Sequence, residues 1–171
     1  MGASDRMTSE RLAFVTESPE ATVEFGARLG ACLEGGDVLG LTGTLGAGKT
    51  CLVKGLARGL GVPDELRVTS PSFVLMRRYE GRLTLYHFDA YRLANADEME
   101  EIGCQEVFDA GGVSAVEWAD HVAACLPPEH FLLTLRVAGR ERRELTLEAI
   151  GLGQSCRNLR LQEALAPWAK G

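Results

Sequence analysis

The chain has 171 residues, of which 46% are hydrophobic and 25% charged, values that are ordinary for a globular protein with a real core. We expect a single domain over residues 11–171, preceded by a disordered tail over residues 1–10. A formal net charge of −6 argues against tight, direct binding to nucleic acid, which needs several cationic side chains on phosphates.

Residues 1–10 are polar and lack the apolar core of a signal peptide. No apolar run approaches the roughly 20 residues of a membrane-spanning helix. We therefore expect a cytoplasmic protein without a membrane partner. The five cysteines are scattered and contain no C-x-x-C pair, so reduced thiols are expected rather than a disulfide framework or a zinc site.

The first predicted helix begins at Ser18-Pro19, because a serine N-cap followed by proline at the first helical position is a strong start signal. Apolar residues then recur on one face up to Leu33, and Gly35-Gly36 ends the helix. The mostly apolar run 37–42 that follows is typical of a buried strand.

Residues 43–50, here called the phosphate loop, read G-T-L-G-A-G-K-T and match the Walker A pattern G-x-x-x-x-G-K-[ST]. Glycines let the backbone adopt positive φ and approach an anion, so that its N–H groups form a nest for phosphate oxygens. Lys49 would bring a positive charge to the β- and γ-phosphates, and Thr50 would offer a hydroxyl to Mg²⁺. The predicted nucleotide-binding residues are Gly43, Leu45, Gly46, Ala47, Gly48, Lys49 and Thr50.

A helix is predicted directly after this loop, because leucine and valine recur at helical spacing from Leu52 to Leu60 before Gly61 and Pro63 stop it. Strand, glycine loop and helix is the arrangement that a phosphate site requires. The helix N-terminus would add a partial positive charge at the phosphate.

Residues 70–73, here called the switch segment, read Ser-Pro-Ser-Phe and mark a break rather than a strand interior. They lie where a switch loop can reach the γ-phosphate, although an ordinary polar loop is the alternative. Runs 73–76 and 83–88 are β-like, and Glu80-Gly81 between them predicts a hairpin.

Two acids are predicted at strand ends. Asp89 follows the run 83–88, at a position where nucleotide enzymes hold Mg²⁺ or a water, and His87 on the same strand face is interpreted as a structural histidine. The run 113–117 has the Walker B pattern and ends in Glu117, at the strand end where ligands bind in open α/β sheets. Asp89 and Glu117 therefore compete for the metal and water roles.

An acidic helix is predicted between these strands, with Asn95 as its N-cap and with Met99 and Ile102 on its inward side. Its glutamates form either a solvated face or a docking surface for a basic partner.

A short helix over 119–126 precedes two alternating runs, 131–137 and 144–150, which predict an antiparallel hairpin and hence a mixed sheet. Arg140, Arg142 and Arg143 form a basic cluster near the turn, either solvated or in contact with nucleotide or a partner. A C-terminal helix is expected over 159–168.

Four motifs in order resemble the TsaE family, formerly YjeE, small bacterial ATPases needed for the threonylcarbamoyl modification of adenosine 37 in tRNA. The phosphate loop departs from the family pattern G-[DE]-L-G-A-G-K-T only at Thr44. The other motifs are the switch segment S-P-[ST]-[FY], the H-x-D-x-Y-R pattern at His87, Asp89, Tyr91 and Arg92, and the pair Glu117-Trp118. The resemblance runs from about residue 18 to about residue 140.

The resemblance implies a three-layer α/β/α P-loop NTPase fold, with a mixed, mainly parallel central sheet and an antiparallel C-terminal hairpin. It implies binding of ATP and Mg²⁺, with slow hydrolysis by the chain alone. The implied protein partners are TsaB and TsaD; TsaD transfers threonylcarbamoyl to tRNA, and ATP turnover would reset that pair. Gly139 joins the predicted ATP-binding residues on the resemblance alone.

The resulting hypothesis makes Lys49, Asp89 and Glu117 the catalytic residues. Lys49 would hold the β- and γ-phosphates, Thr50 and Glu117 would hold Mg²⁺, and Asp89 would position either the metal's water shell or the attacking water. Ser70, Ser72, Tyr91, Arg92 and Trp118 are expected on parts that respond to the γ-phosphate. Among these, Arg92 is the best internal candidate for an arginine finger, and Trp118 is either a core residue or a mobile aromatic.

Three other classes of protein are compatible with a phosphate loop. A small-molecule or nucleotide kinase would use the arginines near residue 140 as a lid, although no motif for a second substrate is evident. A GTP-dependent switch protein would carry an N-K-x-D-type segment, which is absent from the sequence. A pure interaction module would bind nucleotide only to stabilise a docking surface.

Overall fold

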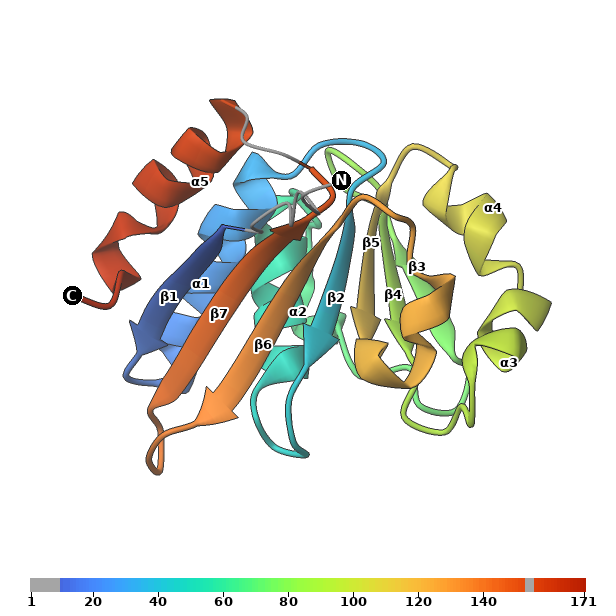
Figure 1. Cartoon of the computed structure of the whole chain (residues 1–171), viewed down its shortest axis with the longest axis horizontal. Coiled ribbons are helices and arrows are strands. Elements are labelled where there is room, and N and C mark those ends of the chain that lie inside the picture. The colour runs from blue at the N-terminus through green and yellow to red at the C-terminus, as the bar shows by residue number, and fades with distance from the viewer. Residues whose placement is uncertain (1–9, 153–155) are drawn as a thin grey trace, which may run out of the picture.

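The computed structural model describes residues 10–152 and 156–171, so the expected tail lies, apart from Glu10, outside the described residues. Within this part of the chain a seven-stranded sheet lies between two layers of helices (Figure 1). Each face of the sheet has its own cluster of buried apolar side chains. This arrangement confirms the predicted three-layer α/β/α fold.

The strands follow one another across the sheet in the order β1-β7-β6-β2-β5-β4-β3. Strand β2 pairs in parallel with β5 and β6, and β5 pairs in parallel with β4. The pairs β1–β7, β7–β6 and β4–β3 are antiparallel, so β1 points in the same direction as β6. The sheet is therefore mixed and mainly parallel, with an antiparallel C-terminal hairpin. The strands are β1 (Arg11–Thr16), β2 (Val38–Thr42), β3 (Met76–Tyr79), β4 (Leu85–Asp89), β5 (Val113–Glu117), β6 (His130–Val137) and β7 (Arg143–Ile150).

Strand β1 is an addition to the elements expected from the sequence. Its residues alternate in burial, with Phe14 and Thr16 buried, and it pairs with β7 from Arg11 opposite Glu148 to Thr16 opposite Arg143. Its partner strand lies far along the chain, so no turn signal marks the pairing. A short edge strand of this kind is fixed by tertiary contacts rather than by local sequence.

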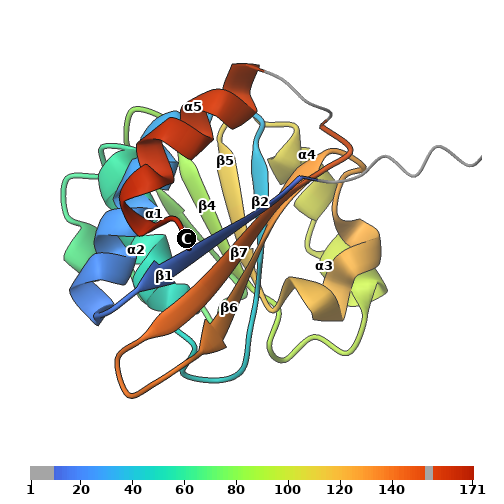
Figure 2. The same cartoon turned by 60° about the vertical axis from the view of Figure 1, so that its left-hand side comes forward.

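Helices α1 (Pro19–Cys32), α2 (Lys49–Gly59) and α5 (Cys156–Leu165) cover one face of the sheet, and α3 (Ala96–Glu101) and α4 (Cys104–Phe108) cover the other (Figure 2). Two predicted N-caps are confirmed: Ser18 Oγ accepts a hydrogen bond from the Ala21 amide at 3.0 Å, and Asn95 Oδ1 accepts one from the Glu98 amide at 3.2 Å. In the described residues, no helix is both long and apolar enough to cross a membrane.

Several expected boundaries differ from the structure. Residues 73–75 form a turn, and the hairpin strand begins at Met76. Ile102 is 39% exposed and does not join Met99 in the core, because helix α3 ends at Glu101. The segment Ala119–Cys125 is a 3₁₀ helix with a kink at Val122. The C-terminal helix begins earlier than expected and continues into a 3₁₀ turn, Ala166–Trp168.

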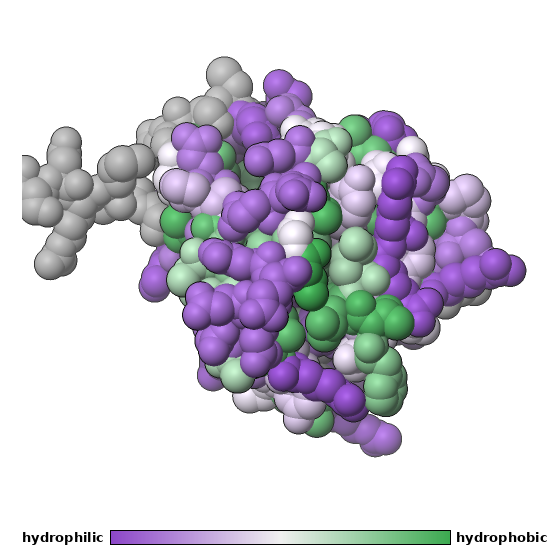
Figure 3. All heavy atoms as spheres, turned by 90° about the vertical axis from the view of Figure 1, so that its right-hand side faces the viewer, coloured by the Kyte–Doolittle hydropathy of each residue, from purple (hydrophilic) through white to green (hydrophobic). Residues whose placement is uncertain are grey.

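Figure 3 views the side of the molecule on which α3 and α4 lie, where hydrophilic side chains gather beside a smaller apolar area. Three acids of α3 are exposed: Asp97, Glu100 and Glu101. The predicted choice between a solvated face and a docking surface stays open. The cysteines Cys32, Cys51, Cys104 and Cys125 are free thiols, as expected.

Helices α1 and α2 approach each other closely enough for their backbones to touch. A Cβ added to Gly55 would lie 2.1 Å from the carbonyl oxygen of Val23, and one added to Gly59 would lie 2.1 Å from that of Ala27. Gly26 and Gly30 face the same contact from α1. These glycines fix the position of α2, and with it the position of the phosphate loop that leads into α2.

Replacing Gly55 with alanine should lower the free energy of unfolding by about 1–3 kcal/mol, because the new methyl group must push the helices apart. Alanine is intrinsically the better helix former by about 1 kcal/mol, so helix propensity alone predicts the opposite sign. Urea unfolding monitored by circular dichroism measures the difference. A more stable Gly55→Ala variant would show that the two helices tolerate wider spacing.

Candidate nucleotide site

A cavity of about 430 Å³ opens at the carboxyl edge of the parallel strands. It is bordered by the phosphate loop between β2 and α2, by the switch segment, and by the ends of β4 and β5. This is the edge at which ligands bind in open α/β sheets. Most of the residues predicted for the site line this cavity: Leu45, Gly46, Gly48, Lys49, Thr50, Ser70, Ser72, Asp89, Tyr91, Arg92, Glu117 and Trp118.

The phosphate loop has the backbone conformation that its glycines predict. Gly43, Gly46 and Gly48 all have positive φ, at 146°, 78° and 105°. A Cβ on Gly43 would lie 2.5 Å from the carbonyl oxygen of Leu135 in β6, so this position has no room for a side chain. Ala47 is fully buried, with its methyl group close to Gly43. Gly43 and Ala47 therefore shape the loop from beneath instead of lining the cavity.

Lys49, the first residue of α2, lies between its own loop and an aromatic ring. Its Nζ donates hydrogen bonds to the carbonyl oxygens of Gly43 at 2.6 Å and Thr44 at 3.0 Å. The same atom lies 3.8 Å from the centroid of the Trp118 ring, a distance typical of a cation–π contact. Burial lowers the pKa of Lys49, and the negative charges of Glu117, Asp120 and Asp89 oppose that shift.

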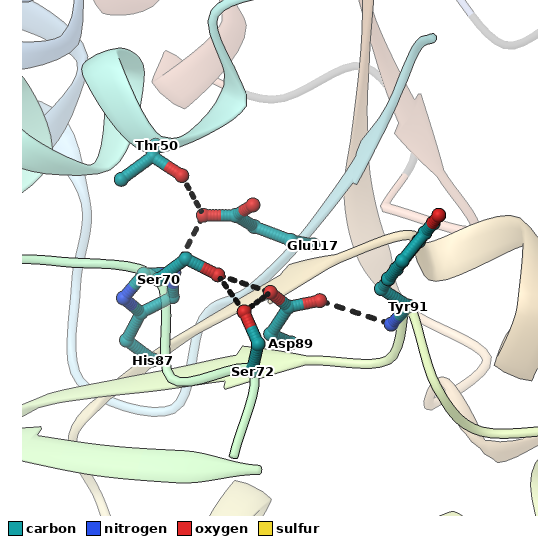
Figure 4. A network of polar contacts seen from close by, with 7 residues as sticks. All are labelled: Thr50, Ser70, Ser72, His87, Asp89, Tyr91 and Glu117. Atoms are coloured by element: carbon teal, nitrogen blue, oxygen red, sulfur yellow. Dashed lines mark hydrogen bonds and ion pairs between the residues drawn. The ribbon is translucent and has the colours of Figure 1, made fainter. Parts of the chain in front are cut away.

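Glu117, at the end of β5, is buried and is held from two sides (Figure 4). Thr50 Oγ1 donates a hydrogen bond to Glu117 Oε1 at 2.9 Å. His87 Nε2 lies 2.7 Å from the same oxygen, and the His87 side chain is fully buried. Because a carboxylate oxygen accepts, this geometry assigns a proton to Nε2.

His87 Nδ1 has no hydrogen-bond partner among the described residues. His87 is thus a buried residue of the sheet, as predicted, but its role is to hold a site carboxylate. Sequence reasoning missed the contact with Glu117, because the parallel pairing of β4 with β5 sets it. The shared strand face of His87 and Asp89 was the only local signal for it.

Asp89, at the end of β4, is buried and is bonded to the switch segment. Its Oδ2 accepts hydrogen bonds from Ser70 Oγ and, at 3.3 Å, from Ser72 Oγ (Figure 4). Its Oδ1 accepts a hydrogen bond from the Tyr91 amide at 2.9 Å. Asp89 and Glu117 are register partners on neighbouring strands, so the two predicted acids do lie together. Glu117 faces Thr50, whereas Asp89 faces the switch segment.

Aromatic rings and one arginine complete the rim of the cavity. The Trp118 ring lies 4.9 Å from that of Tyr91, and Trp118 has a positive φ of 59°, which is uncommon for a bulky residue. The Arg92 guanidinium lies 4.4 Å from the centroid of the exposed Phe73 ring. Arg92 therefore contacts the switch segment, and Trp118 contacts Lys49.

Gly139 lies in the turn between β6 and β7 and is not among the residues that line the cavity. The turn nevertheless contacts the phosphate loop through Arg143, which donates to the carbonyl oxygens of both Gly139 and Ala47. Sequence reasoning left Arg143 open between a solvated charge and a contact with nucleotide or a partner, and it did not anticipate a contact with the loop. The structure makes it a contact residue of the loop backbone.

The side-chain oxygens of Thr50 and Glu117, 2.9 Å apart, are ligands of the kind that fits Mg²⁺, a hard cation that binds oxygen. In the described part of the chain, no group of three or more histidine, cysteine, aspartate or glutamate residues could hold a metal. Mg²⁺ is ordinarily bound by one or two carboxylates together with water and substrate phosphates. A metal at this edge would accordingly be shared with a phosphate ligand.

A glycine loop between β2 and α2, with acids at the ends of two neighbouring parallel strands, defines a P-loop NTPase fold. Residues 16–145 match the family described as threonylcarbamoyl adenosine biosynthesis protein TsaE. The chain belongs to the TsaE family.

Similar proteins cover most of the chain. A tRNA threonylcarbamoyladenosine biosynthesis protein TsaE from Treponema pallidum is 47% identical over 133 residues, which are 78% of this chain and 97% of that protein. The protein of the same name from Bacillus subtilis is 41% identical over 143 residues, which are 83% of this chain and 88% of that protein. The crystal structure of YdiB from Bacillus subtilis superposes with a TM-score of 0.73 at 35% identity, covering 94% of this chain and 97% of that one.

Replacing Thr50 with valine should lower the free energy of unfolding by about 1–3 kcal/mol without added nucleotide. Valine has nearly the same shape as threonine but no hydroxyl, so the buried Glu117 loses a hydrogen-bond donor. Thr50→Ser keeps the hydroxyl and serves as the control. Urea titrations of the three proteins give the comparison. Equal stability of the valine variant and the wild type would mean that Glu117 does not depend on this donor.

Proposed function

We propose that this protein is a Mg²⁺-dependent ATPase that acts with TsaB and TsaD in forming the threonylcarbamoyl group on adenosine 37 of tRNA. One observation carries the proposal. Lys49 and Thr50, at the end of a glycine loop with positive φ, line a single cavity together with two buried acids, Asp89 and Glu117. That arrangement supplies a phosphate cradle, a cation and carboxylates in one place.

The phosphate loop would hold the β- and γ-phosphates through its main-chain amides and through Lys49. The Lys49 ammonium has only carbonyl oxygens and an aromatic face as its direct contacts among the described residues. Phosphate oxygens are stronger acceptors than either, so the ammonium would turn toward them. The N-terminus of α2 adds a favourable dipole at the same point.

Thr50 and Glu117 would hold Mg²⁺, Thr50 through its hydroxyl and Glu117 directly or through a water. When bound, the metal would neutralise negative charge on the phosphates. Asp89 would orient the attacking water, since its carboxylate faces the switch segment rather than Thr50. His87 would keep the Glu117 carboxylate in place, because it contacts the same oxygen as Thr50 does.

Hydrolysis by the chain alone would be slow. Arg92 is the one arginine among the described residues that line the cavity, and its guanidinium stacks on Phe73. An arginine that reaches the transferred phosphate contributes about 10³–10⁵ in rate, so its absence from that position costs most of the acceleration. A movement of the switch segment, or a residue from a partner, would complete the site.

The partners and the pathway are proposed from the family. The relatives described above are named for tRNA threonylcarbamoyladenosine biosynthesis. TsaB and TsaD are the partners that the family resemblance implies, and the proposed setting is the cytoplasm. The net charge of −6 suits contact with proteins better than tight contact with tRNA.

Replacing Lys49 with alanine should abolish measurable ATP hydrolysis and weaken ATP binding by at least tenfold, because the phosphates lose their only cationic side chain from the loop. Calorimetric titration and a phosphate-release assay measure the two effects. Lys54→Ala, a change of equal charge on the same helix, is the control. Hydrolysis at the wild-type rate by the Lys49 variant would refute the assignment of the phosphate loop.

Affinity capture should recover TsaB and TsaD with this protein in the presence of ATP and Mg²⁺, and recovery should fall when Lys49 is replaced by alanine. The physical reason is that γ-phosphate contacts would order the switch segment that borders the cavity. Equal capture with and without nucleotide would favour a pure interaction module. Transfer of phosphate to an added acceptor, in place of phosphate release, would favour a kinase.

A further inference from the structure

The guanidinium of Arg143, the first residue of β7, lies between the phosphate loop and the β6–β7 turn. Figures 1 and 2 both place this turn beside the loop that joins β2 to α2. All three nitrogens of the guanidinium donate to main-chain carbonyl oxygens. Nε bonds to Ala47 at 3.0 Å and Nη2 to Gly46 at 3.3 Å, while Nη1 faces Gly139 at 3.2 Å, Arg140 at 3.4 Å and Arg142 at 3.0 Å.

Two of the carbonyl groups that Arg143 contacts, those of Gly46 and Ala47, are groups that a phosphate cradle must turn away from its ligand. When successive N–H groups point into a nest, the carbonyl groups of the same residues point outward and need donors of their own. Gly46 and Ala47 lie in the middle of the loop, between the positive-φ glycines Gly43 and Gly48. A planar guanidinium can donate to two neighbouring carbonyl oxygens at once, which an ammonium cannot do with the same geometry.

Among the described residues, no ion pair involves Arg143, whereas Arg142 pairs with Glu17 and Arg136 pairs with Glu144. Burial raises the pKa of the Cys51 thiol, and Arg143 is one of two cations that oppose this rise. Cys51 lines the cavity, whereas Arg143 is not among the lining residues.

The sheet holds Arg143 firmly enough for it to position a loop. Its backbone pairs with Val137 of β6 on one side and with Thr16 of β1 on the other. The loop glycine Gly43 packs against Leu135 of the same hairpin. The hairpin and the phosphate loop therefore meet at two points, one made by backbone packing and one made by the Arg143 side chain.

We propose that Arg143 is a positioning residue for the nucleotide: its guanidinium holds the carbonyl groups of Gly46 and Ala47 so that the loop amides face the phosphates. This inference rests on the proposed function, because it assigns Arg143 a role at the same site. Arg143 acts through the loop and does not itself contact the reacting atoms. Its side chain connects the phosphate loop with the C-terminal hairpin.

The test compares three variants of the full-length protein with the wild type. Arg143→Gln removes the charge and the guanidinium fork, and Arg143→Lys keeps the charge without the fork. Arg136→Gln removes the same charge from an exposed position on the same hairpin and is the matched control. Calorimetry measures the affinity for ATP and for inorganic tripolyphosphate, which has the phosphate chain without base or ribose. Thermal unfolding without ligand measures stability.

The expected result is a loss of about tenfold to hundredfold in affinity for Arg143→Gln, equal for ATP and tripolyphosphate, with a melting temperature close to that of the wild type. Arg143→Lys should recover only part of the affinity, and Arg136→Gln should bind both ligands like the wild type. Equal losses for the two ligands mean that Arg143 acts on the phosphate cradle.

Four results would overturn the proposal. A loss confined to ATP would mean that Arg143 contacts the base or the ribose, and full recovery by lysine would mean that charge alone suffices. A large fall in the melting temperature of Arg143→Gln together with its loss of affinity would indicate a general structural role. Unchanged binding by Arg143→Gln would show that Arg143 does not position the nucleotide. Wild-type protein that fails to bind either ligand would refute the proposed function as well, so the two failures are distinguishable.

Discussion

The site depends on one constraint: the backbone of residues 43–48 must follow a tight curve that leaves no room for a side chain against β6 and that needs positive φ within the loop. Gly43 meets this constraint where a Cβ would collide with β6, and Gly46 and Gly48 meet it through positive φ. The loop can hold this curve because its two ends are fixed, by β2 in the sheet and by α2 against α1. Backbone contacts at Gly55 and Gly59 fix α2, so glycines far from the cavity also determine where Lys49 lies.

The two acids of the site show how neighbouring parallel strands can bring carboxylates together and still give them different partners. Asp89 and Glu117 are opposite each other at the ends of β4 and β5, yet each has different partners. Glu117 contacts Thr50 and His87, and Asp89 contacts the serines of the switch segment. The two carboxylates therefore occupy different places, Glu117 beside α2 and Asp89 beside the switch segment.

Sequence reasoning succeeded where the signal was local. The Ser18 and Asn95 caps, the phosphate loop and both hairpins follow from residues a few positions apart, because capping and turn geometry are local properties. It failed where the outcome depended on distant packing. Strand β1 forms on a partner more than a hundred residues away, and Ile102 is exposed because α3 stops one residue before it.

The sequence by itself determined that residues 43–50 carry the Walker A pattern between a strand and a helix, and that the family motifs follow it in order, because these properties are encoded by residue type at short spacing. Only the tertiary structure decided that His87 holds Glu117 and that Arg143 holds the loop. The first contact joins residues that are 30 positions apart in the chain, and the second joins residues that are 96 positions apart. Their existence depends on strand order and register, which are fixed by the packing of the whole sheet rather than by any one segment.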